Sequence, residues 1–375
     1  MPMKHYDVIV IGTGGVGSAA LYHLAARGVR ALGLDRFPIA HDRGSSHGES
    51  RIIRLSYFEH AGYVPLLKRS YELWDALAQA SGRALLHRVG ILYVGAHDRP
   101  IIHGVRDSAT AHQLDVTAVD SAALSARFPG FQVPEASSAL FEQDAGYLLV
   151  EDCVRAHAEL AIARGAEHST GHAVRGWRYE DGRVIVDTDS APFSADRLIL
   201  SAGPWSNALL ASLDIRLRVL RKHLHWFETN GYKETDGCPT FFYDTPNGYY
   251  YGFPKRDALG LKVAEHSRGV EVDDPLNDPR AIDPDELERV KTFLRTCLPG
   301  VSTRHSRHEV CFYTMSPDEN FIVDRHPDHP EVVFAAGLSG HGFKMTAALG
   351  EALVELALDG TTSQPIGFLG LSRLG

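Results

Sequence analysis

Three glycines near the start of the chain have the spacing of a phosphate-binding turn. Gly12, Gly14 and Gly17 form the pattern G-x-G-x-x-G directly after the apolar run 6–11. Such glycines permit a tight turn, let the backbone approach a pyrophosphate, and allow the next helix to pack closely against the strand. Asp35 lies about 20 residues further on, where a carboxylate accepts a hydrogen bond from a ribose hydroxyl. The pattern predicts a dinucleotide site, but it does not distinguish a flavin dinucleotide from a nicotinamide one.

A group of basic side chains follows at residues 44–54, which have the sequence GSSHGESRIIR. His47, Arg51 and Arg54 lie within eight positions of one another, beside the expected nucleotide-binding fold. A planar guanidinium suits a carboxylate ligand because it donates two parallel, charge-assisted hydrogen bonds. Taken alone, however, the segment is more typical of a solvated basic loop.

The same segment contains the nucleophile-elbow pattern of serine hydrolases, as Gly44-x-Ser46-x-Gly48. That motif needs a strand immediately before the serine and a helix after it. Here a loop precedes the serine, so the sequence disfavours a serine hydrolase.

The 20 histidines of the chain raise the question of a metal site. His223 and His225 are close in sequence, and so are His305 and His308. Neither pair is joined by a convincing third ligand or by a helical two-histidine motif. We therefore expect no metal and assign these histidines surface or packing roles.

The segment 44–54 resembles the corresponding part of the monomeric sarcosine oxidase and N-methyltryptophan oxidase family of flavoproteins. The resemblance continues in family order over almost the whole chain. Ser46 and Ser50 stand where the family often has His and Thr, a difference that concerns the fit of the substrate more than the redox step. The other matching stretches are 63–66 (YVPL), 247–254 (NGYYYGFP), 260–262 (GLK) with His266, 310–314 (VCFYT) and 337–344 (GLSGHGFK).

For the cofactor, the resemblance implies FAD attached covalently to Cys311 through a thioether at the 8-methyl carbon of the isoalloxazine. A free cysteine is otherwise a small buried hydrophobic residue, an interpretation that suits Cys153, Cys238 and Cys297. The resemblance also implies that a helix beginning near Phe343 presents its positive end to the reduced, anionic ring. The other residues expected to contact FAD are His47, Arg51, Ser45, Tyr313, Gly340, Gly342 and Lys344, beside the glycine turn and Asp35.

For the substrate, the resemblance implies that Arg54 binds the carboxylate and that Lys344 is a second carboxylate contact. It places Lys262 at the flavin edge, where an ammonium stabilises negative charge as reduced flavin passes an electron to oxygen. Tyr251 and His266 would line the substrate cavity, although a core aromatic and a satisfied histidine are equally good interpretations of these two. Gly340 completes the predicted substrate contacts, and the predicted catalytic set is Lys262, Arg51, His47, Tyr251 and His266.

The elements that must position these groups follow from the apolar periodicity. We expect an α/β protein, α+β overall, in which a Rossmann-like FAD-binding domain is interleaved with a mostly antiparallel substrate (catalytic) domain. Residues 1–82, 148–216 and 318–375 are expected to form the first domain, and residues 83–147 and 217–317 the second. The strands expected in the first are 6–11, 31–34, 197–201 and 332–336, with helices around 16–24, 154–161 and 349–356; strands and hairpins are expected at 89–94, at 177–187 and through much of 217–264.

The bulk composition limits the partners of the protein. Its 375 residues are 44% hydrophobic and 23% charged, and a net charge of -9 gives no footprint for nucleic acid or an anionic membrane. The apolar runs are far shorter than the roughly 20 residues needed to cross a bilayer. A strand pattern that starts by Tyr6 leaves no room for a signal peptide, and four scattered cysteines do not resemble a disulfide framework. We expect a cytoplasmic monomer that acts on a small molecule and O2.

Together these observations predict FAD-dependent oxidation of the C–N bond of a small secondary amino acid, such as sarcosine or N-methyl-L-tryptophan. The imine product would hydrolyse to formaldehyde and the primary amino acid, while O2 is reduced to H2O2. One alternative is an FAD- or NAD-dependent dehydrogenase of another amine or a cyclic amino acid. Another is a flavin-binding module without turnover, because a fold does not guarantee a function.

Overall fold

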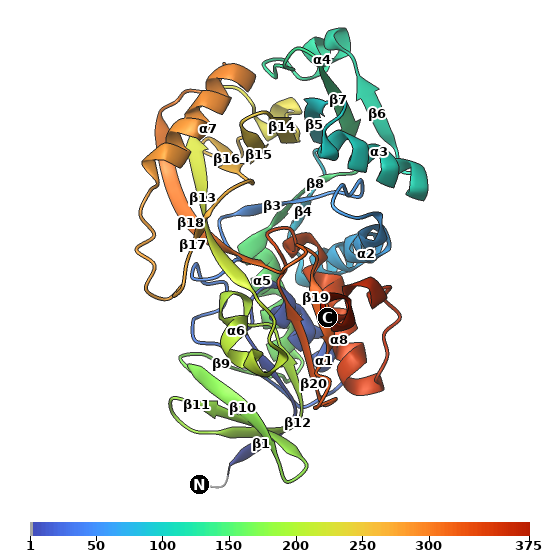
Figure 1. Cartoon of the computed structure of the whole chain (residues 1–375), viewed down its shortest axis with the longest axis vertical. Helices are drawn as coiled ribbons and strands as arrows, with labels where there is room; N and C mark the ends of the chain where they lie inside the picture. Colours follow the sequence, from blue (N-terminus) through green and yellow to red (C-terminus); the bar gives the residue numbers. More distant parts are fainter. Residues whose placement is uncertain (1–2) are drawn as a thin grey trace.

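The computed structural model describes residues 3–375, which fold around two large β-sheets (Figure 1). In the first sheet, β1 pairs in parallel with β2 and β12, and β12 pairs in parallel with β20. All of β2 and β20 is buried, as expected for a parallel sheet covered on both faces. The eight strands are β1 (Lys4–Ile11), β2 (Ala31–Leu34), β9 (Glu167–Ser169), β10 (Val174–Glu180), β11 (Arg183–Thr188), β12 (Phe193–Leu200), β19 (Ile322–Arg325) and β20 (Val332–Ala336).

Four helices pack beside this sheet and shield it from water. They are α1 (Gly15–Ala26), α2 (Val64–Ser81), α5 (Val150–Ala163) and α8 (Thr346–Asp359). Helix α1 packs against both α5 and α8. The approach to α8 is close because a Cβ on Gly350 would lie only 2.6 Å from the Cβ of Ala19. Small residues at this crossing therefore hold the first helix, and the turn before it, in a fixed place.

The second sheet has nine strands in the order β17-β13-β16-β15-β14-β5-β7-β6, with β18 also paired to β13. Every neighbouring pair is antiparallel except β14 and β5, which are parallel. The bounds are β5 (Ile91–Ala96), β6 (Val116–Val119), β7 (Ser137–Glu142), β13 (Arg218–Phe227), β14 (Thr240–Thr245), β15 (Gly248–Phe253), β16 (Leu261–Glu265), β17 (Val270–Glu271) and β18 (His305–Met315).

Helix α7 (Pro284–Cys297), orange in Figure 1, covers one face of this second sheet. Its apolar side chains Val290, Phe293 and Leu294 pack against Tyr243 and Tyr250 of the sheet. The helix begins at Asp283, whose side chain accepts hydrogen bonds from the first-turn amides. That N-cap fixes where the helix starts relative to β13, which carries the buried His223 and His225.

A small sheet lies between the two large ones and brings the basic segment into place. It consists of β3 (Ser50–Ile53), β8 (Gly146–Leu149) and β4 (Leu86–His87), with β8 in the middle. Arg51 is on β3, so its backbone is fixed by the ladder to β8. The remaining helices are α3 (Pro100–His112), α4 (Ser121–Arg127), α6 (Ser206–Leu209), η1 (Ala61–Tyr63), η2 (Gly203–Trp205), η3 (Ala211–Leu213), η4 (Glu234–Asp236), η5 (Phe343–Met345), η6 (Gly367–Leu369) and η7 (Leu371–Leu374).

The predicted fold class is confirmed, and most predicted elements are found within a few residues. The strands expected at 31–34 and 332–336 coincide with β2 and β20, and the hairpin expected at 177–187 is β10–β11. Its turn residues Asp181 and Gly182 both have positive φ, at 50° and 76°. The first sheet takes its strands from residues 4–34, 167–200 and 322–336, and the second from 91–142 and 218–315. The domain boundaries themselves stay a prediction. Within residues 3–375, no helix combines the length and the apolar character that a membrane crossing requires.

Candidate functional site

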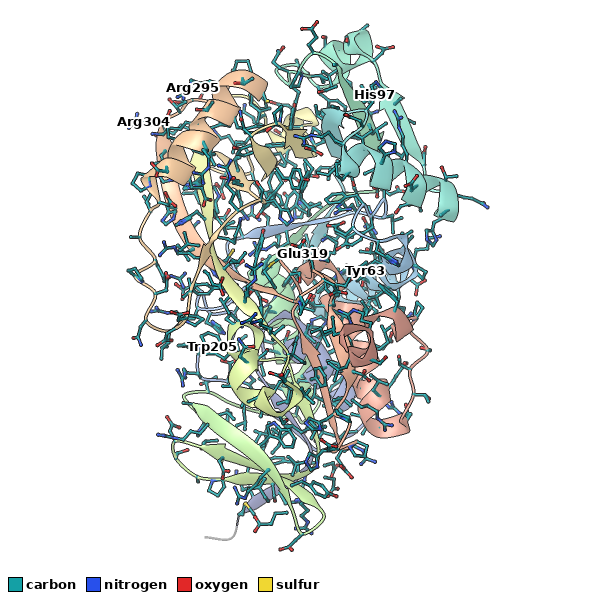
Figure 2. The ribbon with its side chains drawn as sticks, in the orientation of Figure 1. Tyr63, His97, Trp205, Arg295, Arg304 and Glu319 are labelled. Atoms are coloured by element: carbon teal, nitrogen blue, oxygen red, sulfur yellow. The ribbon has the colours of Figure 1, made fainter. Side chains whose placement is uncertain are left out.

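A cavity of about 370 Å³ extends from the carboxyl ends of β1 and β2 to the second sheet. Ile11 and Leu34 line it where those two strands end, and Tyr251 and Tyr313 line it where it meets the second sheet. Ligands of open α/β sheets bind at such carboxyl ends. Trp205 of η2, in the lower half of Figure 2, also lines the cavity. The cavity therefore joins the predicted dinucleotide turn to the predicted substrate residues.

The glycine turn has the geometry that a pyrophosphate requires. Gly12 has a φ of +83°, and a Cβ there would lie 2.6 Å from the Ser201 carbonyl oxygen. A Cβ on Gly17 would lie 1.8 Å from the carbonyl oxygen of Gly12, so strand and helix meet without room for a side chain. Gly14 differs, since its nearest neighbour would be 3.5 Å away and it faces the cavity. Gly14 also caps α1, and the first backbone N–H of the helix, on Gly15, donates to Oγ of Ser46 at 3.1 Å, so Ser46 lies at the helix end that would attract an anion.

Asp35 lies at the end of β2 and lines the cavity, as its predicted role requires. Its Oδ2 accepts hydrogen bonds from the backbone N and the Oγ1 of Thr13, at 2.8 and 3.1 Å. Its Oδ1 accepts a hydrogen bond from the backbone N of Phe37 at 3.0 Å. The carboxylate thus fixes the glycine turn as well as facing the cavity, a role that the motif alone does not reveal.

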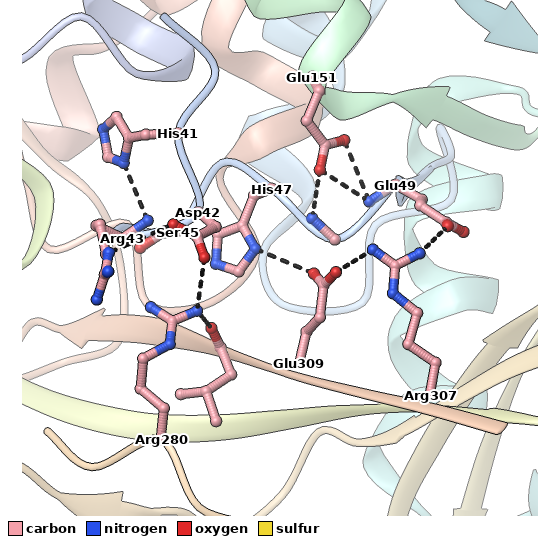
Figure 3. Close-up of polar contacts among 12 residues, drawn as sticks. His41, Asp42, Arg43, Ser45, His47, Glu49, Glu151, Arg280, Arg307 and Glu309 are labelled. Carbon is pink, nitrogen blue, oxygen red and sulfur yellow. Dashed lines mark hydrogen bonds and ion pairs between the residues drawn. The ribbon is translucent and has the colours of Figure 1, made fainter. Parts of the chain in front are cut away.

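The segment 44–54 is not a solvated loop, so that interpretation is wrong. His47 is 1% exposed, and its Nδ1 lies 3.3 Å from Oε2 of Glu309 on β18. Figure 3 shows this contact beside Glu151, which accepts hydrogen bonds from the backbone N of Gly48 and of Glu49. Partners from distant parts of the chain therefore bury the segment and hold its shape. His47 itself does not line the cavity, whereas Ser45 and Arg51 do.

Arg51 and Lys262 both donate hydrogen bonds to backbone carbonyl oxygens of this segment. The Arg51 Nη1 and Nη2 donate to the carbonyl oxygens of Ser50 and Ser45, at 2.9 and 3.0 Å. The Lys262 Nζ donates to the carbonyl oxygens of Gly48 and Ser50, at 2.5 and 2.9 Å. Burial, and then the charge of Arg51, lower the pKa of Lys262 to about 7. Lys262 does not line the cavity, so it approaches the site from behind the backbone of the segment.

Cys311 lies on β18, where it is 1% exposed and packs in one cluster with Tyr251 and Tyr313. Its chain neighbours Phe312, Tyr313 and Thr314 line the cavity, but Cys311 itself does not. Cys153, Cys238 and Cys297 are buried and free as well, so burial does not single out Cys311. What distinguishes it is its place in the strand that forms the cavity wall.

Arg54 is a buried cation whose guanidinium is held by aromatic rings, a carbonyl oxygen and a carboxylate. Its guanidinium is 3% exposed and lies 4.4 and 4.1 Å from the ring centroids of Tyr57 and Phe58. It donates to the Ser56 carbonyl oxygen at 2.8 Å and to both carboxylate oxygens of Glu59 at 2.8 and 2.7 Å. Burial favours a raised pKa for Glu59, but the charge of Arg54 outweighs it and lowers that pKa to about 2. Arg54 already binds one carboxylate, and both side chains line the cavity.

Lys344 is the second buried cation of this end of the cavity. It is 6% exposed, its Nζ donates to the His341 carbonyl oxygen at 2.7 Å, and it lies 5.1 Å from the Tyr57 ring. Burial and the charge of Arg54 lower the pKa of Lys344 to about 7. Near pH 7 the charged and neutral forms of Lys344 are therefore of similar population, and a further anion beside the ammonium would favour the charged form.

An aromatic wall closes the same end of the cavity. His266 Nδ1 lies 3.3 Å from the Tyr313 hydroxyl, which lies 3.5 Å from the Tyr251 hydroxyl. Burial and then the charge of Lys222 lower the pKa of His266 to about 3, so this imidazole is neutral at pH 7. Gly340 has a φ of +78°, and a Cβ there would lie 2.2 Å from Tyr313 Cδ2. The Tyr313 ring therefore occupies the space beside Gly340, and the flavin and substrate contacts expected at this glycine stay predictions.

The matching stretch 337–344 ends at the start of a helix, as expected. Gly342 precedes η5 (Phe343–Met345), and a Cβ on this glycine would lie 2.6 Å from the Cβ of Leu338. Phe343, Lys344 and Thr346 line the cavity at the start of α8. The positive end of this helix therefore faces the cavity.

Several cavity residues escaped the sequence reasoning. Glu59 was missed although it follows Arg54 by five positions, a separation that could have suggested a local ion pair. The others come from segments that only folding brings to the cavity, and nothing in the sequence marks them except for His341, which lies in the matching stretch 337–344 but was given no role. They are His41, His172, Trp205, Phe242 and His341.

Comparison with known proteins agrees with this geometry. A family model described as DAO, FAD dependent oxidoreductase, matches residues 7–356. The chain is 38% identical to a monomeric sarcosine oxidase from Arthrobacter sp., over 99% of this chain and 97% of that protein. It is 36% identical to an N-methyl-L-tryptophan oxidase from Citrobacter koseri, over 94% of each chain. The similarity is therefore not confined to the glycine turn.

Solved structures give the same result for the fold. The open form of NikD, an unusual amino acid oxidase essential for nikkomycin biosynthesis, superposes with a TM-score of 0.87 and 25% identity, covering 98% of this chain and 97% of that one. An L-proline dehydrogenase from P. horikoshii superposes with a TM-score of 0.85 at 21% identity, covering 100% of this chain and 98% of that one, which shows the shared fold alone.

Proposed function

Since the chain belongs to the family of FAD-dependent oxidoreductases, we propose that it is an oxidase of small secondary amino acids. The substrate class is an N-methyl amino acid such as sarcosine or N-methyl-L-tryptophan, and the products are formaldehyde, the primary amino acid and H2O2. The observation that carries the proposal is the pair of buried cations, Arg54 and Lys344, that line the same cavity as the glycine turn. Relatives named for these two substrates support it.

The residues that line the cavity fit FAD at both ends. Gly12 and Gly14 would hold the pyrophosphate at the start of α1, Gly17 would let the strand and the helix meet there, and Asp35 would accept a hydrogen bond from a ribose hydroxyl. When bound, FAD accepts a hydride equivalent from the carbon beside the amine nitrogen and returns the electrons to O2. The residues that would hold its ring system are Ser45, Arg51, Tyr313, Gly340, Gly342 and Lys344, with His47 supporting the segment behind Ser45 and Arg51.

The two cations would anchor the carboxylate of the substrate. Arg54 presents a planar guanidinium, and its ion pair with Glu59 demonstrates that its geometry accepts a carboxylate. Lys344 would regain its proton when a carboxylate lies beside it, because an opposite charge offsets the effect of burial. Tyr251, His266 and Gly340 would form the wall around the rest of the substrate.

The same charges would prepare the amine for oxidation. An ammonium has no lone pair to assist C–H cleavage, so the substrate must lose a proton first. Arg54, Lys344 and Arg51 favour the neutral amine by like-charge repulsion while the carboxylate stays bound. His266 is neutral at pH 7 and offers a polar but uncharged contact at this end of the cavity. No dedicated base is required.

The proposal also assigns a role in cofactor attachment to Cys311 and a role in oxygen reduction to Lys262. Cys311 would carry FAD covalently, a role supported by its place on the strand whose next three residues line the cavity. Lys262 would stabilise negative charge as oxygen is reduced, a role supported by its burial against Arg51 and the 44–54 segment. The enzyme is further proposed to be a cytoplasmic monomer. Relatives named monomeric sarcosine oxidase support the monomer, and four free cysteines suit a reducing compartment.

A peroxide-coupled screen of N-methyl amino acids on the purified flavoprotein tests the proposal. We expect H2O2 and formaldehyde in equal amounts from at least one N-methyl amino acid. The matched control is the amide of the same amino acid, which keeps the amine but lacks the carboxylate, and we expect it to react poorly. Turnover with an artificial dye but not with O2 would indicate a dehydrogenase instead. Bound flavin that no amine reduces would indicate a module without turnover.

A further inference from the structure

Away from the cavity, ionisable side chains converge where α7 begins beside β13. His223 comes from β13, Asp283 caps α7, and Glu286 lies in the first turn of that helix. One ligand atom from each of the three lies within 4.8 Å of the other two. His223 is 1% exposed and Glu286 is 3% exposed, whereas Asp283 is partly exposed, so the cluster reaches from the interior towards the surface. None of the three residues lines the cavity described above.

Two polar atoms of the cluster lack a partner. Among the residues that the structure describes, no hydrogen bond reaches Nε2 of His223 or Oε1 of Glu286, although both atoms are buried. Buried polar atoms in folded proteins nearly always have a partner, because leaving one unsatisfied is costly. The Asp283 Oδ1 is already used by the backbone N of Asp285 and of Glu286. Its second oxygen has no such capping role.

The cations nearby are committed elsewhere. The Lys222 Nζ donates to three carbonyl oxygens, of His266, Ser267 and Arg268, at 3.1, 2.8 and 2.8 Å. An ammonium has three protons, so these bonds use all of its donors. Arg289 donates to the carboxylate of Glu265 at 2.9 Å.

One ring nitrogen of His223 has a hydrogen-bond partner, and the other is free to bind a cation. Its Nδ1 lies 2.7 Å from Nε2 of His308 on β18. A proton on Nδ1 of His223 would be donated to His308, and the lone pair would then be on Nε2, the unpartnered atom. Metal-bound histidines are oriented in this way, by a hydrogen bond from the ring nitrogen that does not bind the ion.

We propose that His223, Asp283 and Glu286 form a binding site for one divalent transition-metal ion of the zinc class. One imidazole nitrogen and two carboxylate oxygens, with water in the fourth position, are a donor set that Zn²⁺ accepts. An imidazole donor disfavours Mg²⁺ and Ca²⁺, which prefer oxygen ligands. The ion would join the start of α7 to β13 and satisfy both unpartnered atoms. The missing third ligand of the His223–His225 pair is thus supplied by a helix about 60 residues further along the chain.

The test is a titration of the flavin-loaded protein with ZnCl2, after dialysis against a chelator, on protein purified without a histidine tag. We expect calorimetry to show one equivalent of Zn²⁺ bound and the melting temperature to rise with the metal. Glu286→Gln keeps the shape of the side chain but removes its charge, and should weaken binding at least tenfold. His223→Gln should do the same. His97→Gln, at an exposed site on the far side of the second sheet (Figure 2), should bind as the parent does.

The stability of the metal-free variants makes the result decisive. Without metal, Glu286→Gln should melt no lower than the parent, because it removes a buried carboxylate that lacks a partner. If Glu286→Gln loses its flavin spectrum, the Zn²⁺ affinity of His223→Gln tests the site instead. Stoichiometric binding that either substitution weakens, and His97→Gln does not, supports the site. Absence of stoichiometric binding, or equal affinity in the parent, Glu286→Gln and His223→Gln, overturns it.

Discussion

The ion pair between Arg54 and Glu59 allows the structural and binding roles of Arg54 to be separated. Replacing Arg54 by Met removes the proposed carboxylate anchor but also leaves Glu59 without its partner. The pKa of Glu59 falls from 4.5 to about 2 in the folded protein. At about 1.4 kcal/mol per pKa unit, this corresponds to about 3 kcal/mol of stability. Breaking a buried pair by removing one partner costs about 3 to 5 kcal/mol, so the two figures agree.

Arg54→Met should therefore lower the free energy of unfolding by about 3 kcal/mol, measured by urea unfolding of the flavin-loaded enzyme. Arg54→Met with Glu59→Gln should recover most of that loss, because no uncompensated carboxylate remains. Substrate binding should not recover. Loss of a desolvated charge contact costs about 2 to 5 kcal/mol, so the double variant should bind the amino acid about 30-fold to several thousand-fold more weakly.

The assays are urea unfolding and titration of the flavin absorbance with the amino acid under anaerobic conditions. Glu59→Gln alone is the matched control, since it keeps the guanidinium and its bond to Ser56. It should bind the amino acid at least as tightly as the parent, because an internal competitor for Arg54 is gone. Parent-like affinity in the double variant would show that Arg54 does not anchor the carboxylate, and the reasoning would be refuted.

Three further predictions follow from the site. Cys311→Ser should lose the flavin fluorescence that stays with the denatured parent on a gel, while Cys297→Ser, at another buried thiol, should keep it. Lys262→Met should slow reoxidation by O2 at least tenfold in stopped-flow traces and leave flavin reduction nearly unchanged, with the exposed Lys68→Met as control. Propionate should inhibit less as the pH rises through about 7, because Lys344 is protonated below that pH and loses its charge above it. Lys344→Met should flatten this profile.

Each of these results has a contrary outcome. Fluorescent protein from the Cys311 variant on a denaturing gel would place the flavin link elsewhere or show that there is none. If both half-reactions slowed equally in the Lys262 variant, the ammonium would not act on oxygen. An inhibition constant for propionate that did not change between pH 6 and pH 8 (about one pH unit to either side of the pKa) would exclude Lys344 from the anion site.

The local parts of the fold were predictable from the sequence alone. The glycine turn after 6–11 was recognised because a positive φ at Gly12 and the contact at Gly17 depend on the residue type at those positions. The strands and helices of the first sheet were found because apolar periodicity is a signal between near neighbours. The proposed substrate cations were identified through motifs that resemble a known family. Arg54 and Lys344 are both buried, which is consistent with a binding role, but the motifs themselves did not predict this burial.

The environment of each charged group was decided only by the tertiary structure. His47 meets a carboxylate 262 positions away, and Lys262 meets the carbonyl oxygen of Gly48 across 214 positions. No local sequence pattern predicts these long-range contacts, because they depend on how the small sheet lies between the two large ones. Burial and neighbouring charge then set the protonation of Lys262, and the start of α7 places two carboxylates beside His223. The sequence determined which side chains were present and how nearby backbone would fold, whereas long-range packing determined which of them became partners.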